Sequence, residues 1–216
     1  FDNDGRSDVF FTNGMTRSFN DSDHRANPRL LTQMTEWDAY ADAPVRREQN
    51  LAFANRGDLR FDDVSKAWGL DHVGISGPAA YGDLDADGDL DLVVLNADEP
   101  LSLYRNETNN DAWLRVELQG TNSNRFGIGA VVRVYSNDRV QVRQMTPMTG
   151  FLSCNEPIAH FGLDEAATID RVVVNWPSGA TQVLNDVQAG QTLRIVESKI
   201  AASPENDAIT RARREP

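Results

Sequence analysis

The strongest constraint on the fold is an acidic run near the middle of the chain, in which five aspartates alternate with other residues. It reads Asp83-Leu84-Asp85-Ala86-Asp87-Gly88-Asp89-Leu90-Asp91 and leads straight into the apolar residues 92–95. Carboxylates packed so closely repel one another unless a cation neutralises them. The β-branched, apolar run that follows is typical of a strand rather than a helix. The sequence therefore predicts a cation-binding turn that enters a β-strand.

A shorter run of the same kind opens the chain. Residues 2–8 read Asp2-Asn3-Asp4-Gly5-Arg6-Ser7-Asp8 and lead into the apolar residues 9–11, so both runs fit the pattern D-x-D-G-x-x-D. Residues 51–55 and 101–106 then share the pattern L-x-aromatic-x-N. Each unit is an acidic loop, a strand-like run, a turn and a second strand-like run. An internal repeat of this size indicates stacked units, such as propeller blades or solenoid coils.

Calcium is the ion that the middle run fits best. It takes six to eight oxygen ligands, and alternate side chains of a tight loop can converge on one point. Magnesium is less suited, because it rarely sits in a cage built only from protein groups. We assign side-chain ligands, one backbone-carbonyl ligand and a closing carboxylate, in chain order: Asp83, Asp85 and Asp87; Asp89; Asp91.

Three other interpretations of the middle run are weaker. An EF-hand requires a glutamate at position 12 of its loop and a helix on each side. Position 12 counted from Asp83 is Val94, which lies in the apolar strand-like run. The same run argues against a dockerin-type loop, which also enters a helix. The remaining alternative is a solvated acidic turn without an ion, which is costly for five aspartates at this spacing.

The opening run matches the calcium pattern only in part. Asp2, Asp4 and Asp8 take the positions of side-chain ligands, and Arg6 takes the position of the carbonyl donor. The first ligand would precede Phe1. We therefore expect the chain to be the C-terminal part of a longer protein, and we leave open whether this loop holds an ion.

The pattern of the chain changes near residue 110. Short runs that alternate apolar and polar residues follow, separated by polar or glycine-containing turns, as in antiparallel strands with one solvated face. We predict a first unit at 1–110 with a polar insertion at 14–49, a second unit at 111–198, and a flexible tail at 199–216. The predicted fold class is all-β: the C-terminal blades of a β-propeller followed by an antiparallel β-sandwich-like domain.

Composition limits the partners. The chain has 33 acidic against 21 basic residues and a net charge of -12, so it lacks the clustered positive charge that nucleic acid requires. No stretch approaches the roughly 18 consecutive apolar residues of a membrane span. The single cysteine, Cys154, excludes an internal disulfide and a cysteine-based zinc cluster. We expect it to be a small buried apolar residue.

Catalytic motifs are scarce. Residues 127–129 read Gly-Ile-Gly but lack the third small residue of a dinucleotide fingerprint and enter a strand-like run, so we expect a turn there. Cys154 has no histidine nearby in the sequence, and we expect His160 to bond a loop backbone. Paired loop aspartates also serve glycoside hydrolysis, but calcium already accounts for them here. We expect no enzymatic activity.

The acidic loop followed by an apolar strand resembles the FG-GAP/VCBS repeats of integrin-α-like β-propellers. Residues 50–58, 61–65 and 67–70 are similar to the connecting part of such repeats, as is Tyr81-Gly82-Asp83. The resemblance implies that the loop binds calcium and links strands within a blade. The insertion at 14–49 has no counterpart in the repeats.

The second unit, 111–198, resembles the ASPIC/UnbV domain that follows such repeats in cartilage-acidic-protein-like proteins. Phe126 departs from the pattern, since a polar residue is expected there. The two resemblances together cover nearly all of residues 1–198. The matching runs in the second unit are 113–116, 123–130, 150–153, 160–163 and 176–179.

The resemblance implies an extracellular, cell-surface or periplasmic protein with a non-catalytic role in binding or adhesion. Calcium would stabilise the module, and its ligand would be a protein or a glycan. The alternative is an accessory C-terminal region of a secreted enzyme whose active site lies upstream. Further acidic repeats upstream would favour the first function, and a catalytic motif there would favour the second.

Overall fold

The computed structural model describes residues 1–14, 17, 44–108, 112–164 and 168–199. All regular structure in these ranges is β, as the sequence predicts, and no helix occurs in them. The described residues accordingly contain no apolar helix of membrane-spanning length. Most of the predicted insertion at 14–49 and nearly all of the predicted tail at 199–216 lie outside the described residues.

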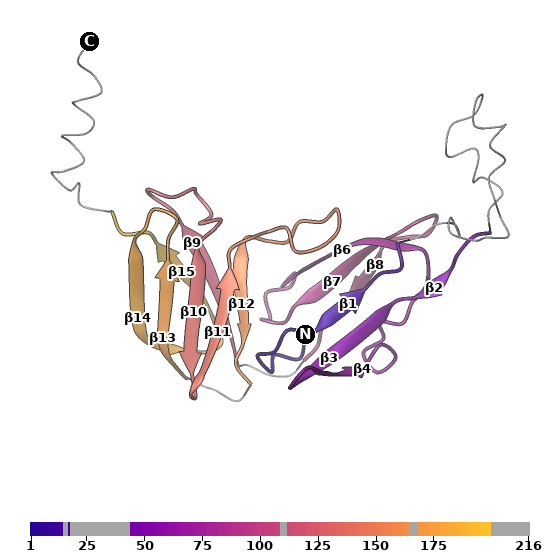
Figure 1. Ribbon diagram of the computed structural model, residues 1–216, viewed down its shortest axis with the longest axis horizontal. Helices are drawn as coiled ribbons and strands as arrows, with labels where there is room; N and C mark the ends of the chain where they lie inside the picture. The colour runs from indigo at the N-terminus through magenta and orange to yellow at the C-terminus, as the bar shows by residue number, and fades with distance from the viewer. Residues whose placement is uncertain (15–16, 18–43, 109–111, 165–167, 200–216) are drawn as a thin grey trace, which may run out of the picture.

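The strands fall into two groups along the chain, which lie beside each other in Figure 1. Those of the N-terminal part are β1 (Val9–Phe11), β2 (Glu48–Gln49), β3 (Leu51–Gly57), β4 (Arg60–Asp63), β5 (Val73–Gly74), β6 (Ser76–Gly82), β7 (Asp91–Asn96) and β8 (Ser102–Tyr104). Those of the C-terminal part are β9 (Trp113–Gln119), β10 (Val131–Ser136), β11 (Arg139–Gln144), β12 (Ile158–Gly162), β13 (Thr168–Asn175), β14 (Thr181–Gln188) and β15 (Gln191–Val196).

The N-terminal part contains two three-stranded sheets of related construction, β1-β3-β4 and β6-β7-β8, and a short β2-β5 pair. In each three-stranded sheet, the strand that follows an acidic loop pairs antiparallel with the next strand of the repeat. Phe11 pairs with Leu51, and Val94 pairs with Ser102. The position equivalent to Leu51 is therefore Ser102 and not Leu101, so the predicted alignment of the L-x-aromatic-x-N runs is wrong by one residue.

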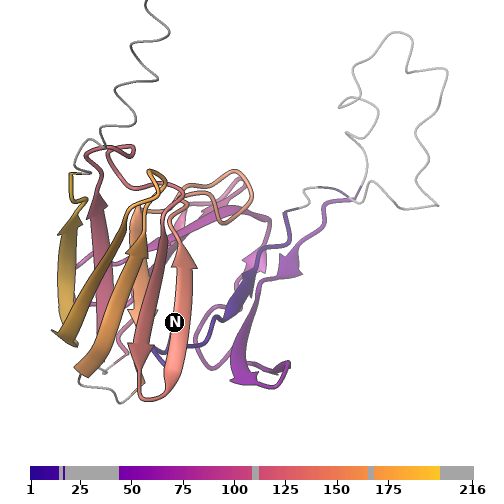
Figure 2. The same cartoon turned by 60° about the vertical axis from the view of Figure 1, so that its left-hand side comes forward.

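The C-terminal part is a sandwich of a four-stranded sheet, β11-β10-β13-β14, and a three-stranded sheet, β12-β9-β15. Figure 2 shows the two layers. One pairing departs from the predicted antiparallel sandwich, because β15 runs parallel to β9. The physical reason is that β14 belongs to the opposite sheet, so the chain crosses between layers before β15 instead of making a hairpin within one sheet.

The two parts differ in the size of their apolar cores. The sandwich buries 16 apolar residues between its sheets, among them Leu114, Phe161 and Trp176. The core of the N-terminal part has six buried members. Because apolar burial is the main source of folding free energy, the described N-terminal part depends more on its polar contacts for stability. The six are Ala52, Ala54, Val64, Leu70, Leu92 and Val94.

Strand alternation in the sandwich leaves one face of the β12-β9-β15 sheet turned away from its core. Leu114 and Val116 of β9 are fully buried in the sandwich. Arg115 lies between them on the opposite face and pairs in register with His160 of β12. Arg115 is only 8% exposed, because the N-terminal part covers this face. The outer face of the sheet is therefore an internal contact between the two parts.

One expectation about an individual residue is wrong. Cys154 is exposed, because it lies in the irregular segment between β11 and β12 and not on an alternating strand. Trp176 is only 4% exposed, at the end of β13.

Candidate metal centre at the junction of the two parts

Three of the predicted calcium ligands come together in the loop between β6 and β7. Carboxylate oxygens of Asp83, Asp85 and Asp91 all lie within 4.8 Å of one another. Two oxygens bound to one calcium ion, at about 2.3–2.6 Å each, are at most about 5 Å apart. The three carboxylates are therefore close enough to bind one ion together.

Two residues with positive φ shape this loop. Ala86 has a φ of 65° and Gly88 a φ of 95°. A Cβ atom on Gly88 would lie 1.9 Å from Cε2 of Trp113, so the loop packs against the first strand of the sandwich at this point. Asp83 accepts hydrogen bonds from the amides of Asp87 and Gly88, at 3.1 Å each, which close the turn. Only glycine satisfies both the backbone conformation and the space at position 88.

The other two predicted ligands take different roles in the loop. Asp87 is not part of the carboxylate cluster, and its Oδ1 accepts a hydrogen bond from the amide of Asp89 at 3.0 Å. The Asp89 carboxylate is buried and accepts a hydrogen bond from the Asn3 side chain at 2.8 Å. Burial, and then the charges of Asp87, Asp83 and Asp91, raises the pKa of Asp89 to about 6. This is consistent with a ligand role for the backbone of Asp89 rather than for its side chain.

The opening loop has the same backbone construction as the second. Asn3 and Gly5 have positive φ, as do Ala86 and Gly88 at the equivalent positions. The amide of Arg6 donates to Asp4 at 2.7 Å, as the amide of Asp89 does to Asp87. The repeat therefore specifies the loop conformation through its aspartates and through positions that adopt positive φ.

The closing aspartates of the two loops are also held in the same way. The amide of Asn55 donates to Asp8 at 2.9 Å, and the amide of Asn106 donates to Asp91 at 2.8 Å. The side-chain amides of the two asparagines reach back to the carbonyls of Ser7 and Leu90 respectively. The asparagine of the repeat thus ties the second strand of each unit to its acidic loop.

The carboxylates of the opening loop make separate contacts and do not lie together as those of the second loop do. Asp4 forms an ion pair with the Arg6 side chain at 2.9 Å, and Asp8 accepts from the amino group of Phe1 at 2.9 Å. Burial, and then the charges of Asp8 and Asp4, raises the pKa of Asp2. Among the described residues, the carboxylate groupings close enough to share a metal ion do not include this loop.

A buried arginine joins the second loop to the sandwich. Arg115 donates to Asp83 at 2.8 Å and makes two hydrogen bonds of 2.9 Å to the carboxylate of Glu156. The side chains of Arg115 and Asp83 are 9% and 1% exposed. The charge of Asp83 is therefore already partly neutralised, and its position is fixed from the sandwich side.

A second link runs through Asn3. Its side-chain nitrogen donates to Asp89, and its side-chain oxygen lies 2.8 Å from Nε2 of His160. Burial lowers the pKa of His160 to about 3, so the ring is neutral near pH 7, and Nε2 is the nitrogen that carries the proton toward the asparagine oxygen. The backbone oxygen of Asn3 accepts from the amide of Asp164 at 2.8 Å. Asn3 thus links the opening loop, to which it belongs, with the second acidic loop and with the sandwich.

Sequence reasoning missed these linking residues. Arg115, Glu156 and His160 lie in the second unit, far along the chain from the loops that they contact, and nothing in their local patterns names a partner. His160 contacts a side chain of the other part and not a loop backbone, so its predicted partner is wrong. One clue was available, since Arg115 is a charged residue in an otherwise apolar part of a strand.

The donor set fits a hard cation. The three gathered carboxylates offer oxygen only, which suits calcium and not the softer transition metals. Arg105 contacts Asp85 at 2.8 Å and approaches Asp87 at 4.0 Å, which places a positive charge beside the same carboxylates. Of the two residues considered for catalysis, Cys154 is exposed, and Nε2 of His160 lies 2.8 Å from the side-chain oxygen of Asn3.

Comparison with known protein families identifies the domain in the C-terminal part. Residues 120–202 match the family described as ASPIC and UnbV, so the C-terminal part contains an ASPIC/UnbV domain. The match begins after β9, although β9 is the central strand of the three-stranded sheet. The folded unit is therefore longer than the matched segment.

The chain as a whole is similar to cartilage acidic protein 1. It is 31% identical to the human protein over 204 residues, which cover 91% of the chain and 26% of the human protein. It is 32% identical to the mouse protein over 186 residues, and 31% identical to the Xenopus tropicalis protein over 218 residues. These cover 83% and 98% of the chain, and 24% and 29% of those proteins. The chain therefore spans about a quarter of the length of these relatives.

Proposed function

We propose that the chain is a non-catalytic, calcium-stabilised binding module of an extracellular protein. In this proposal residues 1–108 are blades of an FG-GAP/VCBS-type β-propeller, and the ASPIC/UnbV domain is docked against their calcium loop. The single observation that carries the proposal is the grouping of Asp83, Asp85 and Asp91 within 4.8 Å in a loop of repeated construction.

The repeated loop supports the propeller assignment. Two acidic loops with the same hydrogen bonds each precede a strand of a three-stranded antiparallel sheet. The blades of a propeller are repeated four-stranded antiparallel sheets, and in this proposal each three-stranded sheet is part of one blade. The apolar side chains of Leu95, Leu101 and Leu103 are more than half exposed in this chain, which fits a surface that further blades would cover.

Calcium would stabilise the part of the molecule with the smaller core. Arg115 and Arg105 pair with Asp83 and Asp85, but the β6–β7 loop still carries an excess of carboxylates. Binding energy at such a site becomes folding energy. Asp83 also contacts Arg115, so the same loop would hold the propeller part against the sandwich. Extracellular calcium is high enough to fill a site of modest affinity.

The extracellular location and the binding role rest on similarity. The relatives are named for cartilage and for acidity, and the chain itself carries a net charge of -12. The ligand class expected is a protein or a glycan. An accessory role beside an upstream catalytic domain is the second candidate, and it makes the same predictions for the calcium loop.

Thermal melting tests the calcium proposal. The melting temperature of the chain should rise with calcium and fall with a chelator, and magnesium at the same concentration should raise it less. Asp87→Ala, which removes a negative charge and a hydrogen bond of the loop, should reduce the calcium-dependent part of the shift. Equal melting temperatures with calcium and with chelator would refute the proposal.

A matched variant separates metal binding from loop structure. Asp4 occupies the position of Asp87 in the opening loop and accepts the equivalent backbone hydrogen bond. Asp4→Ala should lower the melting temperature with and without calcium by the same amount, because it removes the turn but not the gathered carboxylates.

A further inference from the structure

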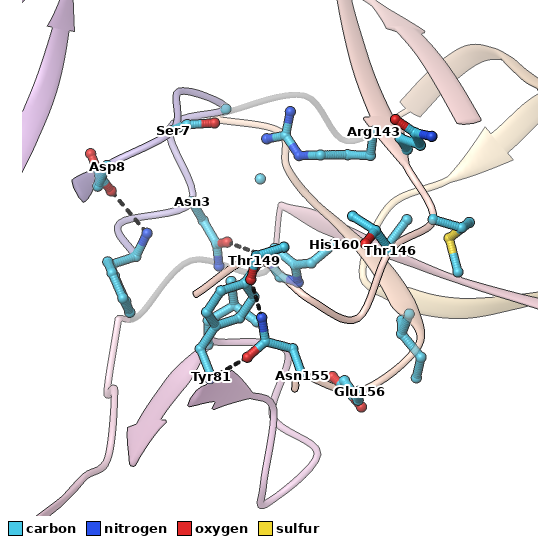
Figure 3. Close-up of a pocket in the computed structure, with 18 of the residues that line it drawn as sticks. Asn3, Ser7, Asp8, Tyr81, Arg143, Thr146, Thr149, Asn155, Glu156 and His160 are labelled. Atoms are coloured by element: carbon cyan, nitrogen blue, oxygen red, sulfur yellow. Dashed lines mark hydrogen bonds and ion pairs between the residues drawn. The ribbon is translucent and has the colours of Figure 1, made fainter. Parts of the chain in front are cut away.

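A cavity of about 240 Å³ lies between the N-terminal part and the sandwich. Its walls come from the opening loop, from Tyr81 at the end of β6, from β11, and from the segment that leads into β12. Figure 3 shows the side chains that line it. The volume is below the about 300–1,000 Å³ of pockets for drug-sized ligands, so it has room for one small ring.

Most charged groups in this cavity are neutralised by partners in the same structure. Arg6 is paired with Asp4 at 2.9 Å. Glu156 is paired with Arg115 at 2.9 Å. Asp8 accepts a hydrogen bond from the amide of Asn55.

Arg143 is the exception among the charged lining residues. Its side chain extends from β11 into the cavity, on the side where Ser7 lies (Figure 3). It lies over the ring of Phe161 at 5.6 Å and donates to the neighbouring carbonyl of Val142 at 3.2 Å, and the described residues place no carboxylate within ion-pair distance of it. Burial lowers its pKa. Arg143 is partly exposed, so burial removes only part of the water around its guanidinium. An oxyanion in the cavity would supply the counter-charge that no described carboxylate provides.

The rest of the lining is neutral and rich in hydrogen-bonding groups. Tyr81, Thr149 and Asn155 form a chain of hydrogen bonds at one side of the cavity (Figure 3). The hydroxyls of Ser7 and Thr146 have no hydrogen-bond partner within the described part of the chain, so they are free to bond a ligand. This surface suits a ligand that carries several hydroxyl groups.

The number of unpaired charges in the cavity favours a carboxylate as the acidic group of the ligand. Phosphate and sulfate esters are usually held by several cations or by a helix N-terminus, whereas this cavity has one unpaired cation and the described residues contain no helix. One arginine matches one carboxylate in a two-point contact. The cavity therefore combines a carboxylate contact, hydroxyl and amide contacts, and the space for one ring.

We propose that this cavity binds a uronic acid unit of an acidic polysaccharide, with its carboxylate on Arg143 and its hydroxyls on the neutral side chains around Tyr81. The inference rests on the proposed function, because it names the ligand class of the binding module. An acidic peptide is the competing occupant.

Calorimetric titration of the 216-residue chain with methyl glucuronide tests the proposal. Methyl glucuronide should bind saturably and at least tenfold more tightly than methyl glucoside, which lacks the carboxylate. It should also bind more tightly than acetate, sulfate or N-acetylaspartate. Absence of saturable binding at tens of millimolar would overturn the proposal. Equal affinity for acetate or sulfate would also overturn it, because the cavity would then recognise only the negative charge. Tighter binding of N-acetylaspartate than of methyl glucuronide would overturn it too.

Two arginine variants locate the contact. Arg143→Gln should weaken methyl glucuronide binding at least tenfold. Arg171→Gln is the matched control, because this arginine also lies over an aromatic ring, that of Tyr135 at 4.1 Å, but it is outside the cavity. The affinity of Arg171→Gln for methyl glucuronide should differ from that of wild type by less than twofold. An equal loss of affinity in both variants would contradict the assignment. Arg143→Lys, which keeps the charge in case the glutamine variant does not fold, should bind several-fold more weakly than wild type.

Calcium-dependent melting of the same samples separates this inference from the proposed function. A chain that melts higher with calcium but binds no glucuronide overturns the cavity assignment alone. A chain that binds glucuronide through Arg143 but does not respond to calcium supports the cavity and overturns the metal site.

Discussion

The two acidic loops share one backbone and differ in what their carboxylates do. Each has two positions with positive φ, an aspartate that accepts the amide two residues on, and a closing aspartate that accepts an asparagine amide. Only the loop between β6 and β7 gathers three carboxylates, and one of these, Asp83, precedes the shared pattern. The shared motif therefore builds the turn in both loops, and in the loop between β6 and β7 the carboxylates of Asp83, Asp85 and Asp91 form a candidate metal site.

The loops also differ in how they meet the sandwich. The second loop contacts it through the buried pair of Asp83 and Arg115 and through the packing of Gly88 on Trp113. The opening loop contacts it through Asn3, which bonds His160 and the amide of Asp164. Residues inside both repeats thus take part in the junction.

The largest effect is expected at Gly88. Gly88→Ala places a Cβ atom 1.9 Å from the Trp113 ring and imposes a φ of 95° on a non-glycine residue, so it should lower the free energy of unfolding by about 3 kcal/mol or more. Gly179→Ala is the control, because Gly179 has a φ of 90° with no atom within 4 Å of an added Cβ. It should cost about 1–2 kcal/mol. Urea unfolding followed by circular dichroism measures both, and equal losses would show that the loop does not pack on Trp113.

The next effect is expected at Arg115. Arg115→Met leaves Asp83 and Glu156 without their partner, and breaking a buried ion pair in this way costs about 3–5 kcal/mol. Beside the opening loop, Arg56→Met removes an arginine of β3 that is 44% exposed and 3.7 Å from Asp2, so it should change stability little. Chemical denaturation of both variants gives the comparison. A small effect of Arg115→Met would mean that the two parts are not joined through Asp83.

The last comparison is the pH dependence of stability, whose effects appear only below neutral pH. The pKa of His160 is lowered by burial from its ordinary 6.5 to about 3. The unfolded chain therefore takes up this proton first, and the free energy of unfolding should fall as pH drops from about 6.5 toward 3. His160→Gln should remove that loss.

Within the sandwich, Glu197 titrates in a lower pH range. Burial opposes ionisation of its carboxylate, but hydrogen bonds from Ser123, Ser178 and Thr121 outweigh it and lower the pKa to about 2. This stabilisation is complete above the ordinary pKa of 4.5 and is lost as pH falls toward 2. Glu197→Gln should flatten only that range. Acid titrations of unfolding in which the two variants alter the same range would contradict the assignment of the two effects to different groups.

The sequence predicts local features well because their causes are local. Alternation in residues such as 131–136 is enough to define a strand and its buried face. The spacing of the aspartates predicts that their side chains converge, and the structure gathers Asp83, Asp85 and Asp91 but not Asp87. The parallel pairing of β15 with β9 was missed, because it depends on which sheet the preceding strand joins.

The contacts between the parts could not be predicted from the sequence. Asn3 is an ordinary variable position of the repeat, yet it bonds Asp89 and His160. Arg143 has no local pattern that distinguishes it from other strand arginines, although it extends into the cavity. Such roles are set by which surfaces meet, and no local pattern in one chain contains that information.

Calcium stoichiometry, measured by calorimetric titration of the chelator-treated chain, tests the central claim most directly. Wild type should bind one calcium ion at the β6–β7 loop. Asp85→Asn, which removes one gathered carboxylate, should abolish that binding, whereas Asp2→Asn, at the equivalent position of the opening loop, should retain it. Absence of calcium binding in wild type, or equal loss in both variants, would contradict the account.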